Sequence, residues 1–232
     1  PRQILLEIKK FFKNKDIIKN KKLKALVTTG PTREYIDKVR FISNESSGKQ
    51  GYEFAKALSR VGIETTLITG PTYLDPIKHV KTIKVTSAKQ MLCAVRNLLP
   101  VDIAVCAAAV SDFKPKKVFK KKIKKENKNF LKLELERNSD ILEFLGKNNK
   151  HRPSLVIGFA AEDENLLLNA RNKMISKNCD WMLANDISQK NSGFNVDMNK
   201  ILLLRQDGKK TIINRNTKSY IASLITEKIL QK

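Results

Sequence analysis

The sequence predicts an α/β fold with a Rossmann-like, doubly wound and mainly parallel sheet. The first observation is a β-loop-α-β unit, in which an apolar run at 23–29 leads through a Gly- and Ser-rich loop at 43–51 into a helix, with a second strand at 63–70. The second observation is that strands and helices keep alternating along the chain. The third is the run 101–110, which is apolar on both faces, as a central parallel strand requires.

The first half of the chain has clear element boundaries. Gly62 stops the first helix, and a Gly- and Pro-containing loop at 70–76 precedes a short strand at 81–85. Ser87 and Gln90 match a capping box at the start of the next helix. The apolar faces of the two helices comprise Phe54, Ala55, Leu58 and Val61 in the first, and Met91, Leu92, Val95, Leu98 and Leu99 in the second.

The pattern changes at 129–136, where Leu131, Leu133 and Leu135 alternate with charged residues. This alternation predicts a half-exposed, antiparallel strand. The remaining expected elements are, in order, a helix at 140–145 capped by Asn138 and Ser139, a strand at 154–161, a helix at 165–177, a strand at 180–186, a hairpin of strands at 201–204 and 210–213, and a final helix at 219–230.

The formal net charge of +23 is concentrated in two segments. Nine basic and two acidic residues fall within 1–24, and eight lysines with one Glu fall within 116–128. Neither segment interleaves aromatic residues in a way that suits base stacking, and Phe119 is the lone ring in the second. The charge therefore does not predict a nucleic-acid partner.

Cysteine and histidine usage excludes several kinds of site. Cys93, Cys106 and Cys179 are widely spaced within apolar patterns, which predicts buried free thiols and neither a disulfide framework nor a C-x-x-C site. With two histidines and no G-x-S-x-G, a histidine-based zinc site and a serine triad lack their parts. No apolar run approaches the roughly 20 residues that span a bilayer, and no signal-peptide pattern is seen. We expect a cytoplasmic protein without a membrane partner.

The loop at 43–51 is suited to an anion. It places unpaired backbone N–H groups at a helix N-terminus, where the peptide dipoles favour phosphate or carboxylate. Neither G-x-G-x-x-G nor a P-loop is present. A glycine turn that only packs the helix against the strand therefore explains the spacing equally well.

A second candidate site follows the strand at 101–110, because ligands of such sheets bind beyond the carboxyl ends of the strands. There Ala108 permits close approach of a nucleotide. Asp112 could accept from a base or sugar or hold Mg²⁺ through water, and a turn-forming Asp is the alternative. Lys173 and Lys177, four residues apart, share a helix face that could hold a triphosphate or simply be solvated.

An ordered series of motifs carries a resemblance to a known family. The motifs are Gly30-Pro31-Thr32-Arg33-Glu34, Asp37-x-Val39-Arg40-Phe41-Ile42-Ser43-Asn44-x-Ser46-Ser47-Gly48-Lys49-x-Gly51, Ala107-Ala108-Ala109-Val110-Ser111-Asp112-Phe113, Lys122-Ile123-Lys124-Lys125, Arg137-Asn138-Ser139-Asp140-Ile141-Leu142, Gly158-Phe159-Ala160-Ala161-Glu162, and Ala184-Asn185-Asp186 with Gly193-Phe194-Asn195. In these, from about residue 24 to the end, the chain resembles phosphopantothenoylcysteine synthetase, the C-terminal half of the bifunctional coenzyme A biosynthesis flavoprotein.

The resemblance implies a ligase that joins 4′-phosphopantothenate to L-cysteine. CTP would be converted to CMP and pyrophosphate through an acyl-cytidylate, with Mg²⁺ as cofactor, and ATP is the alternative nucleotide. The nucleotide-binding residues implied are Ala108, Asp112, Lys122, Ser139, Asp140, Ile141, Leu142, Phe159, Lys173 and Lys177.

The resemblance also implies catalytic and substrate-binding residues. Asn44 and Lys122 would be catalytic, with the register of the lysine open across 120–125, and Asp112 would hold the metal, through water or directly. The substrate-binding loop would comprise Arg40, Asn44, Ser46, Ser47, Gly48 and Lys49.

The same resemblance implies a domain organisation. Residues 1–22 comprise an amphipathic helix and a basic linker, at the position that in the family joins a flavin-dependent decarboxylase to the synthetase, and 23–232 are the nucleotide-binding synthetase domain. We therefore expect an N-terminal decarboxylase domain, with its FMN, in the full-length protein, and a free-standing synthetase is the alternative. The strand at 129–136 and the hairpin after Met198 leave apolar faces that predict a homodimer.

Two other classes of protein compete with this reading. A Rossmann-like NAD(P)-dependent oxidoreductase would need G-x-G-x-x-G and an acidic ribose ligand after the second strand, where Thr69-Gly70-Pro71 stands instead. A basic nucleic-acid-binding module would bind random DNA in a salt-sensitive manner. The fold alone decides none of these alternatives.

Overall fold

The computed structural model describes residues 22–124, 132–147, 150–186 and 197–231. Within these residues an eight-stranded sheet forms the centre of the molecule, in the order β12-β11-β10-β9-β6-β1-β4-β5. The parallel strands are β1 (Lys24–Thr29), β4 (Glu64–Thr69), β5 (Lys81–Lys84), β6 (Ile103–Cys106), β9 (Leu155–Glu162) and β10 (Trp181–Asp186), and the antiparallel ones are β11 (Met198–Arg205) and β12 (Lys210–Thr217). This confirms the predicted mainly parallel α/β fold with an antiparallel extension.

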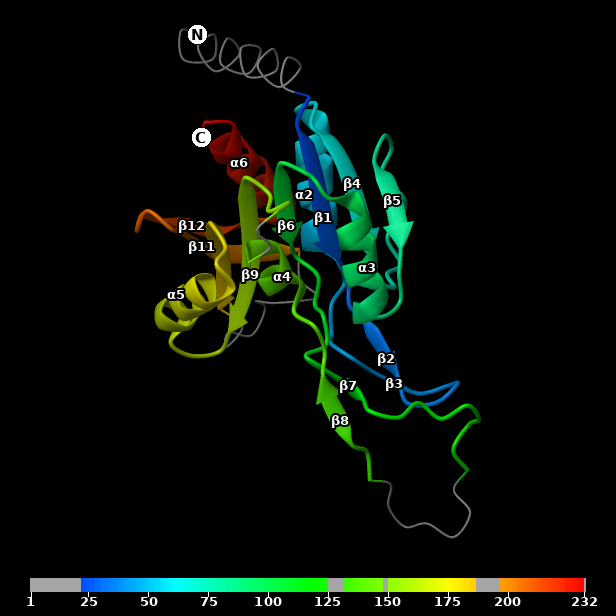
Figure 1. Cartoon of the computed structure of the whole chain (residues 1–232). Coiled ribbons are helices and arrows are strands. Elements are labelled where there is room, and N and C mark those ends of the chain that lie inside the picture. The colour runs from blue at the N-terminus through cyan, green and yellow to red at the C-terminus, as the bar shows by residue number, and fades with distance from the viewer. Residues whose placement is uncertain (1–21, 125–131, 148–149, 187–196, 232) are drawn as a thin grey trace, which may run out of the picture.

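Helices cover both faces of the sheet (Figure 1). They are α2 (Lys49–Arg60) and α6 (Lys218–Leu230) on one face, and α3 (Ala88–Leu98), α4 (Ile141–Lys147) and α5 (Leu166–Lys177) on the other. Along β1, Ala25 and Val27 belong to the core under the first pair of helices, and Leu26 belongs to the opposite core. A strand that is apolar at every position is therefore buried on both sides.

The first βαβ unit forms where the sequence predicts it. β1 and β4 pair in parallel, and α2 crosses between them. Gly48 caps the helix with a φ of +76°, in the left-handed region that favours glycine. Thr29 Oγ1 donates to the Gly48 carbonyl over 2.7 Å, which fastens the helix start to the end of β1.

Gly51→Ala is expected to lower the free energy of unfolding by about 1–3 kcal/mol. A Cβ at this position would overlap the Thr29 side chain and crowd the Thr28 carbonyl, so α2 would have to move away from β1. Urea unfolding measured beside Arg60→Ala, a change at an exposed position of the same helix, checks this. Equal unfolding free energies for the two variants would contradict it.

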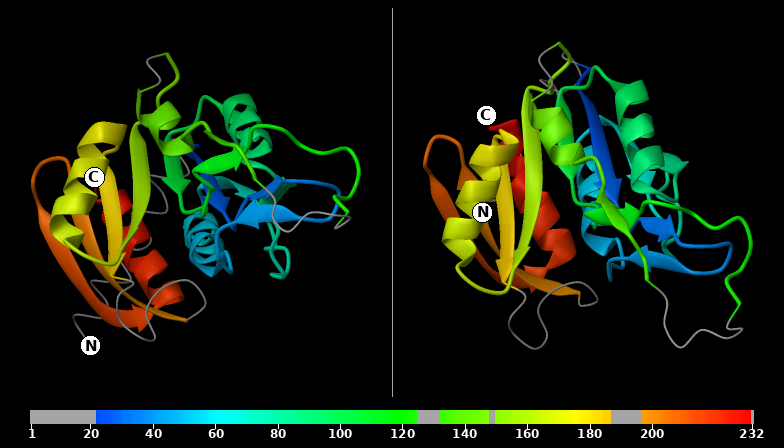
Figure 2. Two further views of the ribbon diagram at one scale, coloured as in Figure 1. Left: turned by 90° about the horizontal axis from the view of Figure 1, so that it is seen from below. Right: turned by 60° about the horizontal axis from the view of Figure 1, so that its bottom comes forward.

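Two small antiparallel pairs extend beyond the carboxyl ends of the central strands (Figures 1 and 2). They are β2 (Arg33–Tyr35) with β3 (Phe41–Ser43), and β7 (Phe113–Pro115) with β8 (Leu135–Arg137). β2, β3 and β7 were not predicted from the sequence, because three residues are too few to show a periodicity. These pairs and the loops beside them carry several exposed apolar side chains, namely Tyr35, Val39, Phe41, Phe113, Val118 and Leu135.

Two predicted strands are shorter than expected. The run 101–110 leaves the sheet after Cys106, and its last part crosses the loop that follows β1, where Ala109 N donates to the Gly30 carbonyl over 2.9 Å. The strand predicted at 129–136 begins only at Leu135, because its partner β7 is only three residues long. Part of that predicted strand lies outside the described residues.

Further details differ from the predictions. Asp140 caps α4 in place of Asn138 and Ser139, since its Oδ1 accepts from Glu143 N over 2.9 Å. Cys93 is exposed, because it faces away from the sheet on α3, and Cys106 is half-buried, whereas Cys179 is buried as predicted. The capping box of Ser87 is confirmed, and the C-terminal hairpin is longer than predicted because β11 and β12 each have eight residues.

The amphipathic helix predicted near the N-terminus lies outside the described residues. Among the helices that are described, none combines the length and the apolar character that crossing a membrane would need.

Candidate active site

A cavity of about 470 Å³ opens where β1 and β6 end. Thr28 and Cys106 form part of its wall from the two strands. Nine of the ten residues that the family resemblance assigned to the nucleotide line this one cavity: Ala108, Asp112, Ser139, Asp140, Ile141, Leu142, Phe159, Lys173 and Lys177. The tenth, Lys122, is not part of its lining.

Hydrogen bonds join the loops around the cavity. Thr32 Oγ1 accepts from Ser111 N over 3.0 Å, and Ser43 Oγ donates to the Thr32 carbonyl over 2.7 Å. Asn138 Nδ2 donates to the Ser111 carbonyl over 2.9 Å. Four motifs that are separate in sequence are thus held in one arrangement around the cavity.

Asn44 lies beside the cavity. Its Nδ2 donates to the carbonyl of Val110 over 2.9 Å, and Val110 lines the cavity. The side chain of Asn44 is exposed. Because an amide has two N–H donors and one acceptor, this single hydrogen bond orients the group without using its full capacity.

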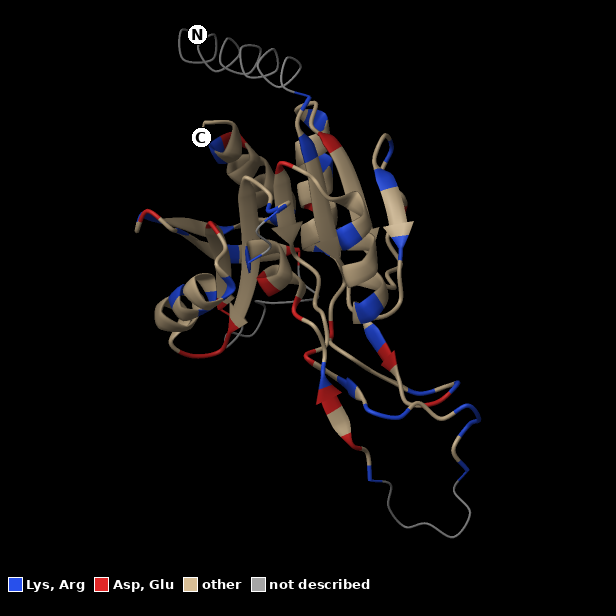
Figure 3. Ribbon diagram, viewed as in Figure 1, with Lys and Arg blue, Asp and Glu red and all other residues tan. Residues whose placement is uncertain are grey.

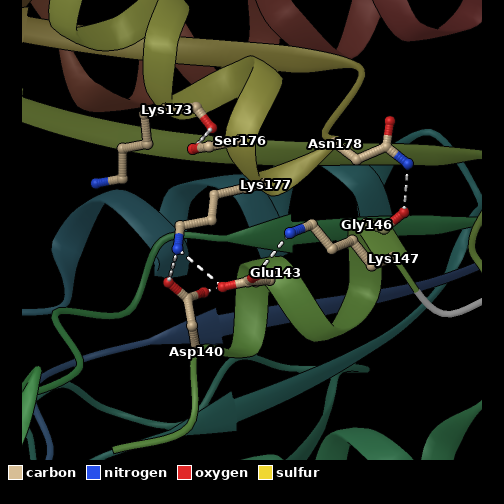
Figure 4. Close-up of polar contacts among 8 residues, drawn as sticks. All are labelled: Asp140, Glu143, Gly146, Lys147, Lys173, Ser176, Lys177 and Asn178. Atoms are coloured by element: carbon tan, nitrogen blue, oxygen red, sulfur yellow. Dashed lines mark hydrogen bonds and ion pairs between the residues drawn. The ribbon is translucent and has the colours of Figure 1, made fainter. Parts of the chain in front are cut away.

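A cluster of ion pairs joins α4 to α5 in the cavity wall (Figure 4). Lys177 Nζ lies 3.0 Å from Asp140 Oδ2 and 2.9 Å from Glu143 Oε2, and Lys147 Nζ lies 2.7 Å from Glu143 Oε1. The hydrogen bonds from Lys147 and Lys177 lower the pKa of Glu143 to about 2. The hydrogen bond to Glu143 is the main cause that raises the pKa of Lys177. Lys177 is therefore a cation held in place on the cavity wall.

Of the two carboxylates that hold Lys177, sequence reasoning missed Glu143, and it named Asp140 only as a nucleotide-binding residue. The available signal was the i, i+3 spacing of Asp140 and Glu143, which places both on one side of a helix start. Cys106 was also missed as a lining residue. Burial raises the pKa of its thiol, so this group stays protonated and is not a nucleophile.

The predicted substrate-binding loop forms the start of α2. Ser46 Oγ accepts from Gly48 N over 3.3 Å, and Ser47 lies between these two residues. Lys49 Nζ pairs with Asp197 Oδ1 over 2.6 Å, which ties the loop to the segment before β11. The predicted helix N-terminus next to a glycine turn is therefore present in the structure.

Arg40 and Lys122 lie apart from this cavity. Arg40 Nη1 binds Asp37 Oδ2 over 2.8 Å and the Ile123 carbonyl over 3.2 Å, so its guanidinium joins two loops instead of facing the cavity. Lys122 is exposed on the loop between β7 and β8, along which Lys and Arg positions gather (blue in Figure 3). Within one chain, the structure does not bring these two residues to the other site residues.

The cavity fits a metal ion only as part of a larger complex. Mg²⁺ is usually bound by one or two carboxylates, with phosphate oxygens and waters completing the octahedron. Asp112 lines the cavity, and nowhere in the described residues do three or more His, Cys, Asp or Glu side chains gather as a metal site would require. Asp112 therefore fits a metal that arrives with a polyphosphate.

The fold and the cavity place the chain among α/β proteins that bind ligands at the carboxyl ends of parallel strands. More particularly, the chain belongs to the family described as the DNA/pantothenate metabolism flavoprotein C-terminal domain, whose profile matches residues 20–232. The family resemblance seen in the sequence motifs is thereby confirmed.

Known relatives agree with this assignment. The coenzyme A biosynthesis bifunctional protein CoaBC of Escherichia coli strain K12 is 39% identical over 215 residues, which cover 91% of this chain and 52% of that protein. CoaBC of Bacillus subtilis strain 168 is 42% identical over 188 residues, which cover 80% and 46%. The crystal structure of the C-terminal domain of a CoaBC matches with a TM-score of 0.76 at 38% identity, covering 90% of this chain and 96% of that one. The chain thus spans about half the length of the curated relatives it matches.

Proposed function

We propose that this domain is a phosphopantothenate–cysteine ligase of coenzyme A biosynthesis. The carboxylate of 4′-phosphopantothenate attacks the α-phosphorus of CTP, which gives an acyl-cytidylate and releases pyrophosphate. The amine of L-cysteine then displaces CMP and forms the amide. The names of the relatives, as bifunctional coenzyme A biosynthesis proteins, support the pathway.

The observation that carries this proposal is the convergence of separate sequence motifs on one cavity. A nucleoside triphosphate requires cations for its phosphates and an apolar or aromatic surface for its base. Lys173 and Lys177 supply the cations, and Leu142 and Phe159 supply the apolar surface.

The residues around the cavity suit both half-reactions. Each step builds negative charge, first on phosphate oxygens and then on the carbonyl oxygen, and fixed donors stabilise such charge best. Lys173 and Lys177 hold the polyphosphate. Asn44, oriented by its bond to Val110, directs an amide toward the acyl group. Asp112 would hold Mg²⁺, which when bound neutralises phosphate oxygens.

The test is pyrophosphate release by the full chain with 4′-phosphopantothenate and each of CTP, ATP, GTP and UTP, with and without L-cysteine. We expect release with CTP, and continuous turnover only when cysteine is present. A complete lack of release with all four nucleotides would refute the ligase function. Release with ATP alone would refute the choice of CTP.

Lys177→Gln is expected to weaken CTP binding roughly tenfold to a hundredfold, because it removes a charge-assisted hydrogen bond to phosphate. Calorimetric titration with CTP and Mg²⁺ measures the dissociation constant. Lys210→Gln, at an exposed position on β12, is the matched control and should bind like the unmodified protein. The assignment of Lys177 fails if the two variants have equal affinities.

We also propose a homodimer that pairs through the β2–β3 and β7–β8 extensions, and no longer through the predicted hairpin after Met198, because Ile201, Leu203 and Ile213 of that hairpin are buried in the core of the chain. Val39 and Val118 are 58% and 56% exposed there, and Phe41 and Phe113 lie on the same extensions. Grouped apolar exposure of this kind favours a partner surface. In such a dimer, the exposed Lys122 of one copy would reach the nucleotide cavity of the other copy.

Sedimentation at micromolar concentration is expected to give a dimer, and Phe41→Glu should shift it toward the monomer. Ile175→Glu, which changes an equally apolar exposed position on α5, should leave the dimer intact. A monomeric unmodified protein, or equal effects of the two variants, would contradict the proposed interface.

Because the chain spans about half of its relatives, we propose that the full-length protein carries an FMN-dependent decarboxylase domain in the remaining half. In this proposal 1–22 is the linker and 23–232 is the synthetase domain. The relatives are named as bifunctional proteins, which supports a second domain.

A further inference from the structure

One buried carboxylate joins the turn between β2 and β3 to the loop that follows β7. Asp37 is 1% exposed. Its Oδ1 accepts from Val39 N and Arg40 N, each over 2.8 Å. Its Oδ2 accepts from Arg40 Nη1 over 2.8 Å and from Ile123 N over 3.1 Å. These four hydrogen bonds occupy all the acceptor positions of an ionised carboxylate, so none is left for a ligand.

The loop that follows β7 is hydrogen-bonded through both the amide and the carbonyl of Ile123. While Ile123 N donates to Asp37, the Ile123 carbonyl accepts from Arg40 Nη1 over 3.2 Å. Four residues earlier, Phe119 N donates to the Ile36 carbonyl over 2.8 Å. These ties fix the backbone on either side of Lys122, whose side chain remains exposed.

Neither Asp37 nor Arg40 belongs to the apolar cores or to the lining of the cavity. The amide of Ile123 is the main cause that lowers the pKa of Asp37, to about 2. The group is therefore a carboxylate at neutral pH. The Asp37–Arg40 pair therefore contributes neither to the cores nor to the cavity. Because it contacts Ile123, the residue after Lys122, it is placed to hold the backbone of that lysine.

We propose that Asp37 and Arg40 are positioning residues, which clamp Ile123 and so set the direction in which Lys122 projects toward the triphosphate bound in the cavity of a second copy of the chain. This inference rests on the proposed function, in which Lys122 is catalytic. It reassigns Arg40 from the substrate-binding loop to the support of the catalytic lysine. The physical reason is that a flexible four-carbon side chain on a polar loop stabilises developing charge only if its backbone is held still.

Asp37→Asn is expected to break the hydrogen bonds to Ile123 and to the Arg40 guanidinium while keeping those within the β2–β3 turn. If Oδ1 of the new amide keeps accepting from the Val39 and Arg40 amides, its Nδ2 faces two other donors, from Ile123 and the guanidinium, and both contacts are lost. We expect the Ile123 amide to exchange with solvent roughly tenfold to a hundredfold faster, the scale of a lost hydrogen bond to a charged group. Single-turnover pyrophosphate release should slow roughly tenfold, and CTP affinity should stay unchanged, because the cavity is separate.

A double-variant cycle tests whether Asp37 acts through Lys122. Asp37→Asn combined with Lys122→Gln should be no slower than Lys122→Gln alone, because the clamp has nothing left to position. Arg40→Gln is the second variant, should Asp37→Asn fold poorly, and should show the same lack of additivity with a smaller loss. Asp207→Asn is the matched control, since its exposed carboxylate likewise accepts from an amide two residues on, Lys209 N, over 3.0 Å.

The outcomes separate this inference from the proposed function. Unchanged exchange of the Ile123 amide in Asp37→Asn would overturn the clamp whatever the activity. Additive rate losses in the double variant, or a loss of CTP affinity that follows a lowered melting temperature, would show a purely structural role and also overturn it. If the unmodified protein releases no pyrophosphate, the ligase function itself fails, and the catalytic reason for the clamp fails with it, while the exchange measurement still reports whether the contact exists.

Discussion

Asn44→Asp is expected to release roughly one equivalent of pyrophosphate per site from CTP and 4′-phosphopantothenate and then stop, with an acyl-cytidylate bound. The aspartate keeps the size of the side chain but removes both N–H donors and adds a negative charge. Its oxygen would face the Val110 carbonyl, which now accepts from Asn44 Nδ2 over 2.9 Å. In the proposed mechanism the first half-reaction depends on the lysines and the metal, so it continues. The second lacks the donor for the carbonyl oxyanion, so it fails.

A rapid-quench experiment with radiolabelled CTP measures both the pyrophosphate and the bound intermediate. Adding cysteine should not clear the intermediate at the normal rate. Asn214→Asp, the same change at an exposed position on β12, is the control and should turn over normally. Normal turnover of Asn44→Asp would make the residue a loop-shaping group, and failure to release any pyrophosphate while CTP still binds would assign it to the first step.

Lys122→Gln is expected to slow pyrophosphate release on the order of a hundredfold, the scale of removing one preorganised charge-stabilising donor. The melting temperature should hardly change, because the exposed side chain lies in a polar loop and supports no core. A lysine that neutralises the triphosphate only in the transition state affects the rate more than the binding of CTP.

Single-turnover kinetics beside calorimetric CTP binding separates these two effects. Lys117→Gln is the matched control, a change in the same loop at a lysine whose Nζ lies 5.8 Å from the centroid of the Phe119 ring. If Lys122→Gln keeps a near-normal rate, the catalytic role moves to Lys121, Lys124 or Lys125. A large fall in melting temperature would instead show that the loop is structural.

Most of the fold could be predicted because its signals are local. The capping box of Ser87 and the doubly apolar strands around Leu26 and Ile157 act over a few residues, and the helices and strands they predict are present. The errors fall where pairing partners decide the outcome. β8 is short because β7 is short, and β6 ends at Cys106 because the following residues pair with the loop after β1.

The candidate site divides in the same way. The sequence by itself determined the βαβ start and the family resemblance, because motif residues lie within a few positions of each other, and the resemblance in turn implied the set of nucleotide-binding candidates. Only the tertiary structure decided that nine of those candidates share one cavity. It also decided that Glu143 holds Lys177, 34 residues away, and that Arg40 contacts Ile123, 83 residues away. Contacts over such separations depend on how the loops cross at the carboxyl ends of the strands, and no local periodicity encodes that crossing.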